Sequence, residues 1–143
     1  MEMNATIRKF GYPATLVKDF TKWVILLRPQ QVTLGSLVLA STERVTAFSA
    51  LSPEAFAELH EITGAVEGAL ARGFAYDKIN YLMLMMVDPD VHFHILPRYA
   101  QTRSFAGRDF CDYGWPGPPD LTRVNATDED VTRAILDHLR SSL

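Results

Sequence analysis

The apolar residues of this 143-residue chain follow a helical period over one long stretch, residues 52–72, and this stretch constrains the fold most. It opens with Ser52-Pro53-Glu54, which supplies a capping hydroxyl, a proline suited to the first helical position and an acid near the positive end of the helix dipole. Gly73 stands where such a helix would end. The apolar stripe consists of Phe56, Leu59, Ile62, Val66 and Leu70. The stretch therefore predicts an amphipathic helix that buries one face.

Short extended segments lie on both sides of this helix. They are rich in Val, Leu, Ile and aromatic residues, and breakers separate them. Arg28-Pro29-Gln30-Gln31 and Gly35-Ser36 mark one connection, and Asp88-Pro89 predicts a turn between the last two segments. The five segments are residues 14–20, 23–27, 34–40, 78–87 and 90–97. This order predicts an α+β fold, in which the helix packs on one face of an antiparallel sheet of about five strands.

Residues 100–143 predict a loop and a helix. The part up to Asn125 is rich in proline and glycine and has no periodicity, so we expect an ordered loop that covers a site or reaches a partner. A final helix is expected from Thr127, as its cap, to Arg140, with Val131, Ile135 and Leu139 on its buried side. No repeat or linker divides the chain, which predicts a single domain over residues 1–143.

Composition excludes several classes of protein. Apolar residues make up 48% and charged residues 22% of the chain, which are ordinary values for a globular protein. A net charge of -3 with no basic run leaves no positive field for general nucleic-acid binding. Cys111 is the only cysteine, so no internal disulfide can form. No stretch approaches the ~18 apolar residues of a membrane span or resembles an export signal. We therefore expect a cytoplasmic protein.

Reactive side chains gather in one extended segment, residues 90–98. Because strand side chains alternate, Asp90, His92 and His94 share one face, and neighbours on that face lie roughly 6.5 to 7 Å apart. One interpretation is a histidine nucleophile that attacks phosphorus while the second imidazole contacts phosphate oxygens. Another is a divalent metal held by two imidazoles and one carboxylate. A third is a pair of histidines satisfied by backbone carbonyls. Spacing does not decide among them.

The string Val91-His92-Phe93-His94-Ile95-Leu96-Pro97-Arg98 resembles the signature of the histidine triad (HIT) nucleotide hydrolases and transferases. That signature is His-x-His-x-His followed by two apolar residues, with Pro-Arg next in the branch that resembles diadenosine polyphosphate hydrolases. Registered on Pro97-Arg98, His94 takes the third triad position, His92 the middle position and Asp90 the first. The resemblance implies that His92 attacks the α-phosphorus and that His94 contacts phosphate oxygens. It also extends to the order of elements from about Trp23 to Arg98.

The sequence departs from the family pattern at three places. Asp90 replaces the first histidine, although in the family the main-chain carbonyl at that position helps to orient the nucleophile. Val87-Asp88-Pro89 stands where the family has a longer Gly-rich loop with a Ser or Gln for the phosphate or leaving group. Arg28 stands near the usual place of an Asn that holds the ribose, and its guanidinium is suited to grip phosphate instead.

Three residues are predicted to bind substrate: Arg28, Arg98 and Ser36. Arg98 is expected either to orient Asp90 or the product phosphate, or to form a surface salt bridge at the end of its strand. Ser36 belongs to the turn that follows the second predicted strand.

Two further features have alternative interpretations. Met83, Met85 and Met86 either line a pocket for the base or fill the core, and methionines on a strand favour the core. Trp115, inside its Pro-Gly loop, either stacks on a base or packs across a dimer interface.

Taken with the resemblance, these residues predict hydrolysis or transfer at the α-phosphorus of a nucleotide through a nucleotidyl-His92 intermediate. The expected substrates are a dinucleoside polyphosphate, a nucleoside phosphoramidate or a similar conjugate. No cofactor is required, although a divalent metal is possible, and the resemblance implies a homodimer. One alternative is a metal-dependent hydrolase with Asp90, His92 and His94 as ligands. The other is a HIT-like protein that binds nucleotide with little catalysis.

Overall fold

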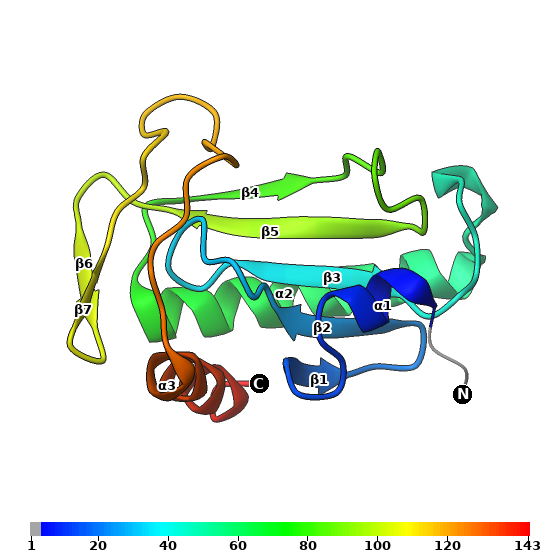
Figure 1. Ribbon diagram of the computed structural model, residues 1–143. Helices are drawn as coiled ribbons and strands as arrows, with labels where there is room; N and C mark the ends of the chain where they lie inside the picture. The colour runs from blue at the N-terminus through cyan, green and yellow to red at the C-terminus, as the bar shows by residue number, and fades with distance from the viewer. Residues whose placement is uncertain (1–3) are drawn as a thin grey trace.

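The computed structural model describes residues 4–143 and contains a five-stranded antiparallel sheet with strand order β1-β2-β3-β5-β4 (Figure 1). The elements in chain order are α1 (Ala5–Lys9), β1 (Leu16–Asp19), β2 (Trp23–Leu27), β3 (Leu37–Ser41), the 3-10 turn η1 (Phe48–Ala50), α2 (Pro53–Phe74), β4 (Lys78–Leu82), β5 (His92–Arg98), β6 (Arg103–Phe105), β7 (Arg108–Phe110) and α3 (Glu129–Arg140). The predicted α+β class and the five-stranded sheet are confirmed. Within the described residues, no helix combines the length and apolarity that crossing a membrane requires.

Helix α2 begins as predicted, with the Ser52 side chain accepting a hydrogen bond from the Ala55 N–H. Its predicted end at Gly73 is wrong, because the helix continues to Phe74 and Ala75 takes the left-handed position at φ 50°. Gly73 instead allows a close approach, since a Cβ there would lie 3.2 Å from the His138 ring. The glycine is a packing feature between α2 and α3.

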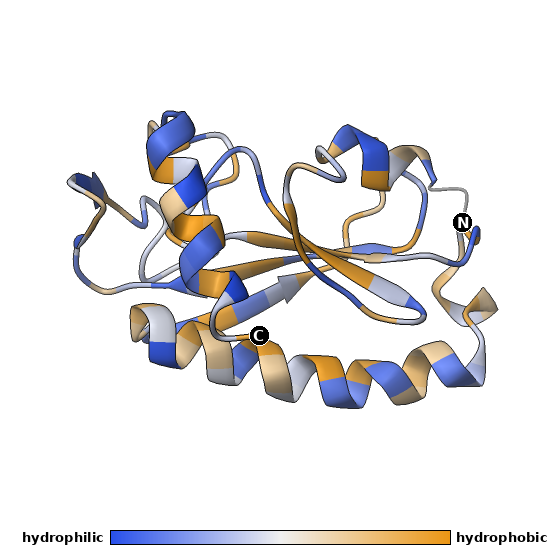
Figure 2. Cartoon of the chain, turned by 90° about the horizontal axis from the view of Figure 1, so that it is seen from below, coloured by the Kyte–Doolittle hydropathy of each residue, from blue (hydrophilic) through white to orange (hydrophobic). Residues whose placement is uncertain are grey.

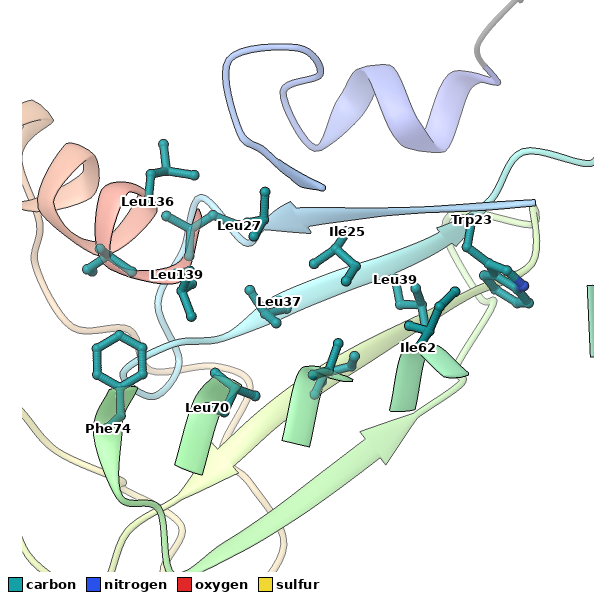
Figure 3. Close-up of a cluster of buried hydrophobic side chains, with 14 of the residues drawn as sticks. Trp23, Ile25, Leu27, Leu37, Leu39, Ile62, Leu70, Phe74, Leu136 and Leu139 are labelled. Atoms are coloured by element: carbon teal, nitrogen blue, oxygen red, sulfur yellow. The ribbon is translucent and has the colours of Figure 1, made fainter. Parts of the chain in front are cut away.

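The main core lies between the sheet and the apolar side of α2. Apolar and polar residues alternate along this helix, as expected of an amphipathic helix (Figure 2). Side chains from β2 and β3 meet those of α2 and α3 there (Figure 3). The labelled members are Trp23, Ile25, Leu27, Leu37, Leu39, Ile62, Leu70, Phe74, Leu136 and Leu139. Gly35 has φ +84°, and a Cβ there would meet the Phe74 ring at 3.0 Å, so the turn before β3 requires glycine.

The opposite face of the sheet is partly covered by α1, which the sequence analysis did not predict. Asn4 caps this helix by accepting from the Ile7 N–H, and its own amide donates to the Ser41 carbonyl at 2.9 Å. A second, smaller core forms beneath it, from Ile7, Phe10, Val24, Leu26, Val38 and Ala40. In the sheet register, Ala40 pairs with His92 and Val38 with His94. Helix α1 therefore packs over the sheet face that carries both histidines.

The two predicted strands at 78–87 and 90–97 do pair, with Leu82 opposite His94, but both are shorter than expected. Strand β4 ends at Leu82, and Met85 has φ 51°, which an extended strand cannot accommodate. The connection is therefore a loop over residues 83–91 that contains Asp88-Pro89, and it does not form a tight hairpin.

Residues 99–125 contain the expected ordered loop and also an unpredicted hairpin, β6-β7, whose turn places Ala106 and Gly107 at positive φ. Buried Asn125 holds the loop by donating to the carbonyls of Gln31, Val32 and Cys111. The predicted cap of the last helix, Thr127, is wrong by one residue. The Asp128 carboxylate accepts from the Val131 N–H, and α3 begins at Glu129.

Candidate active site

His92 is the first residue of β5 and is almost fully buried. Its Nδ1 lies 2.7 Å from the Asp90 carbonyl oxygen. Because a carbonyl can only accept, this contact places the ring proton on Nδ1 and leaves the lone pair on Nε2. Nε2 has no hydrogen-bond partner within residues 4–143. The ring is thus held in the tautomer that an attacking imidazole requires, by the main-chain contact that the resemblance implies.

His94 lies beside His92 on the same face, with ring centroids 5.2 Å apart and planes at 77°. Its Nδ1 is buried and has no partner among the described residues. Burial lowers the pKa of His94 to about 4, and the charges of Arg28 and His92 act in the same direction. His94 is therefore neutral at neutral pH.

Phe10, the C-cap residue of α1, contacts both imidazoles, with centroids 6.1 Å from the His92 ring and 5.7 Å from the His94 ring. It contributes an apolar wall that helps to desolvate the histidines. Phe10 was not predicted as a site residue, because α1 has only five residues, too few for a periodic signal. The local signs were the capping Asn4 and the spacing of three between Ile7 and Phe10.

Asp90 lies two residues before the start of β5, and its carboxylate accepts a hydrogen bond from the Thr6 hydroxyl at 3.1 Å. The contact ties the residue that orients His92 to helix α1. Among residues 4–143, no group of three or more His, Cys, Asp or Glu side chains is placed to hold a metal ion. The structure does not bring the Asp90 carboxylate together with the two imidazoles in the predicted metal-ligand arrangement.

Both histidines line a pocket of about 250 Å³ between α1, the end of β2 and the loop after β4. Its polar wall includes Lys9 and Arg28, and the loop supplies an apolar wall. Lys9 Nζ lies 2.9 Å from both carboxylate oxygens of Asp88, so an ion pair bridges α1 and the loop beside the pocket. The apolar wall consists of Leu84, Met85, Met86 and Val87. A larger hollow of about 550 Å³ lies beside α3, but it contains no imidazole or thiol.

Arg28 follows β2 and joins the histidines in this pocket, as predicted for a substrate-binding residue. Its Nη1 donates to the Gln30 carbonyl at 2.7 Å, while its buried Nε has no partner. No carboxylate in the described part of the chain pairs with the guanidinium. Burial lowers the pKa of Arg28, as it lowers that of His94, because it removes water from around the charged form of the side chain.

The structure does not bring Arg98 to the pocket. Arg98 is buried, and its Nε and Nη2 donate to the two carboxylate oxygens of Asp112 at 2.7 and 3.0 Å. The remaining donors reach the Asn80 side chain and the Gly117 carbonyl. The guanidinium therefore cannot orient Asp90 or hold a product phosphate, and the pair is not the surface salt bridge that was the alternative. It fastens the 112–117 loop to the end of the sheet.

Ser36 also lies outside the pocket. The residue is fully buried, its hydroxyl donates to the Thr33 carbonyl at 2.7 Å, and the same oxygen accepts from the Thr33 N–H at 3.0 Å. The hydroxyl closes the turn before β3, so it is not available to a substrate.

The methionine cluster divides between the two interpretations. Met83 and Met85 pack against the main core, whereas Met85 and Met86 line the pocket, and Met86 is 84% exposed. The core interpretation is therefore wrong for Met86. Trp115 lines a separate hollow with Asn80 and Arg98, away from the histidines of its own chain.

No protein-family model matches the sequence, and no curated protein matches it. Solved structures do match the fold. A histidine triad protein from Sinorhizobium meliloti superposes with a TM-score of 0.78 at 18% identity, covering 99% of this chain and 96% of that chain. The chain has the fold of histidine triad proteins.

Two other HIT structures agree closely. A histidine triad protein from Marinobacter aquaeolei has a TM-score of 0.77 at 18% identity, covering 99% of this chain and 97% of that chain. One from Bradyrhizobium japonicum has a TM-score of 0.75 at 18% identity, covering 99% and 96%. The HIT fold thus extends over α1 and α3 as well as over the motif strand.

Proposed function

We propose that this HIT-fold protein is a nucleotide hydrolase or nucleotidyl transferase that acts at the α-phosphorus through a covalent nucleotidyl-His92 intermediate. The observation that carries the proposal is the hydrogen bond from His92 Nδ1 to the Asp90 carbonyl, which leaves the Nε2 lone pair open beside neutral His94. The proposed substrates are a dinucleoside polyphosphate, a nucleoside phosphoramidate or a related conjugate. We place the protein in the cytosol, in keeping with its single cysteine.

In the first step, His92 Nε2 attacks the α-phosphorus. A phosphorus–nitrogen bond forms as the bond to the leaving group breaks, and the leaving group departs with the electron pair and takes up a proton. In the second step, water attacks the same phosphorus, the bond to Nε2 breaks, and its electron pair returns to the ring. The water loses a proton and the nucleoside monophosphate is released. A transferase replaces this water by another nucleophile.

His94 supplies a donor to the phosphoryl oxygens in this scheme. A neutral imidazole carries one ring proton, and because the buried Nδ1 of His94 has no partner in residues 4–143 that would fix the proton there, Nε2 is free to carry it and to donate. Arg28 adds positive charge to the pocket, so an anionic substrate meets a cation that is already in place. The reaction as proposed requires no cofactor.

One observation favours the second candidate, a nucleotide-binding protein with little turnover. The loop residues that line the pocket, 84–88, are Leu-Met-Met-Val-Asp and bring no side-chain donor to it, and Val87-Asp88-Pro89 stands where the family has a loop with a Ser or Gln. That candidate predicts nucleotide affinity without a covalent adduct.

The deciding experiment is intact-protein mass spectrometry after brief mixing, without acid, with a fluorogenic adenosine phosphoramidate and with diadenosine polyphosphates. We expect a nucleotidyl adduct or turnover in wild type, and its loss in His92→Ala. The control is His60→Ala, because His60 is an exposed histidine on α2 that lies outside the pocket. Nucleotide-induced stabilisation without adduct or turnover would support the binding protein. No adduct, turnover or stabilisation would refute both candidates.

We also propose a homodimer through β4 and α2. Strand β4 is an edge strand, and an apolar groove beside it is lined by Leu39, Leu59, Thr63, Tyr81 and Phe93. Exposed Phe48 and Phe56 contact each other near this surface, and exposed apolar patches of this kind favour association. Light scattering after size exclusion should give twice the chain mass, and Phe56→Glu should shift it toward the monomer. A monomeric wild type would refute the proposal.

A further inference from the structure

Arg28 lines the pocket with a positive charge, but the two proposed steps at His92 do not say which group of the substrate it contacts. The guanidinium is half-buried at the pocket wall, with one hydrogen bond from Nη1 to a carbonyl. Its Nη2 donates to no protein group within residues 4–143, and its Nε is buried without a partner. At least two of its donor groups are therefore unsatisfied in the protein alone.

Among residues 4–143, the pocket offers no free counter-charge to Arg28. The one acid of this part of the chain that lines the pocket, Asp88, is held by Lys9 with both carboxylate oxygens at 2.9 Å. A partly desolvated cation without a partner is costly unless an anion arrives, and a guanidinium fork suits phosphate oxygens best. The unpartnered donors of Arg28 thus favour the binding of an anionic ligand.

The position of Arg28 differs from that of the histidines. It stands at the end of β2, whereas His92 and His94 stand on β5, with β3 between the two strands. The attacked phosphoryl group must meet His92 Nε2 and the adjacent His94 ring. Arg28 approaches the pocket from the other side of β3 and can therefore meet a neighbouring group of the same ligand.

We propose that Arg28 determines substrate specificity by binding a second anionic group, a phosphate adjacent to the phosphorus that His92 attacks. The inference rests on the proposed function and selects within it. Substrates with a phosphoanhydride bond carry two neighbouring anionic phosphates, and their leaving group gains negative charge as the bond breaks. In a nucleoside phosphoramidate the phosphorus–nitrogen bond breaks and the leaving group is an amine, which offers Arg28 no such charge.

The first test compares kcat/KM for diadenosine tetraphosphate and for adenosine 5′-phosphoramidate. Arg28→Gln should lower the ratio of the two values about 10- to 100-fold, the range of a charge-assisted hydrogen bond. Arg28→Lys should restore part of it. The matched control is Arg8→Gln, since Arg8 is exposed on α1 and does not line the pocket. An unchanged ratio, or an equal loss with both substrates, would overturn the inference.

A second test does not need turnover. Calorimetry should show that wild type binds methylenebisphosphonate more tightly than inorganic phosphate, and that Arg28→Gln removes most of this preference. If wild type turns over neither substrate, the proposed catalysis fails, and the bisphosphonate preference alone decides the role of Arg28. If His92→Ala abolishes the adduct but Arg28→Gln changes neither ratio nor preference, catalysis stands and the inference about Arg28 is wrong.

Discussion

His94 makes stability depend on pH in a window that the structure defines. Burial lowers its pKa from 6.5 to about 4, with the charges of Arg28, His92 and Lys9 acting in the same direction and Asp88 opposing them. As the pH falls, His94 therefore binds a proton at a higher pH in the unfolded chain than in the folded chain. The contribution of neutral His94 to the free energy of unfolding is fully present above about pH 6.5. It falls as the pH drops and is lost entirely below about pH 4.

The magnitude follows from the same two values. The difference between 6.5 and about 4 corresponds to about 3 kcal/mol when fully expressed. At pH 5 the unfolded His94 is almost fully protonated and the folded His94 is not, so the loss relative to pH 7 is about 2 kcal/mol. His94→Gln removes the titrating group, and the pH dependence from all other groups is common to both proteins.

Urea denaturation of wild type and His94→Gln at pH 7 and pH 5 measures this difference directly. We expect the free energy of unfolding of wild type to fall by about 2 kcal/mol more than that of the variant. The His94 ring signals in proton–carbon NMR spectra should titrate near pH 4. A midpoint near 6.5, or the same pH dependence in both proteins, would refute the reasoning.

Three further changes test other contacts. Asp112→Asn leaves the buried Arg98 charge without its partner and should lower the free energy of unfolding by about 3 to 5 kcal/mol in urea, and a loss below 1 kcal/mol would contradict the buried pair. Thr6→Val removes the hydrogen bond to Asp90 and should lower kcat several-fold while circular dichroism melting changes little, whereas an unchanged kcat would show that Asp90 needs no anchor. Gly35→Ala strains a residue at φ +84° and should lower the melting temperature by several degrees, so an unchanged melting temperature would exclude strain there.

Local periodicity predicted the parts of the fold that depend on neighbouring residues. The cap at Ser52, the helical stripe that follows and the alternation of His92 and His94 are all read within a few positions along the chain. Strand ends were harder to predict, because β4 ends at Leu82 and the positive φ of Met85 in the following loop is not indicated by its residue type. Helix α1 was missed because five residues give no period.

The site required contacts that connect distant parts of the chain. Asp112, 14 positions from Arg98, holds in a buried ion pair an arginine that was expected either to bind substrate or to form a surface salt bridge. Met86 is apolar, as core residues are, but it is exposed in the loop after β4. The ion pair of Lys9 with Asp88 ties this loop to α1. Phe10 reaches His92 from the other end of the sequence. These contacts are set by packing between elements and cannot be predicted from the spacing of residues along the chain.

An aspartate at position 90 is compatible with the nucleophile that we propose at His92. The contact that sets the His92 tautomer comes from the carbonyl of residue 90, which every residue type possesses, so a change of side chain leaves it intact. The side chain is then available for a different task, and its carboxylate binds Thr6 on α1, 84 positions away. The same helix carries Lys9, which holds Asp88 in the loop on the other side of the pocket. An acid at position 90 thus ties α1 to the residues just before β5, while the orientation of the His92 ring is set by the main chain.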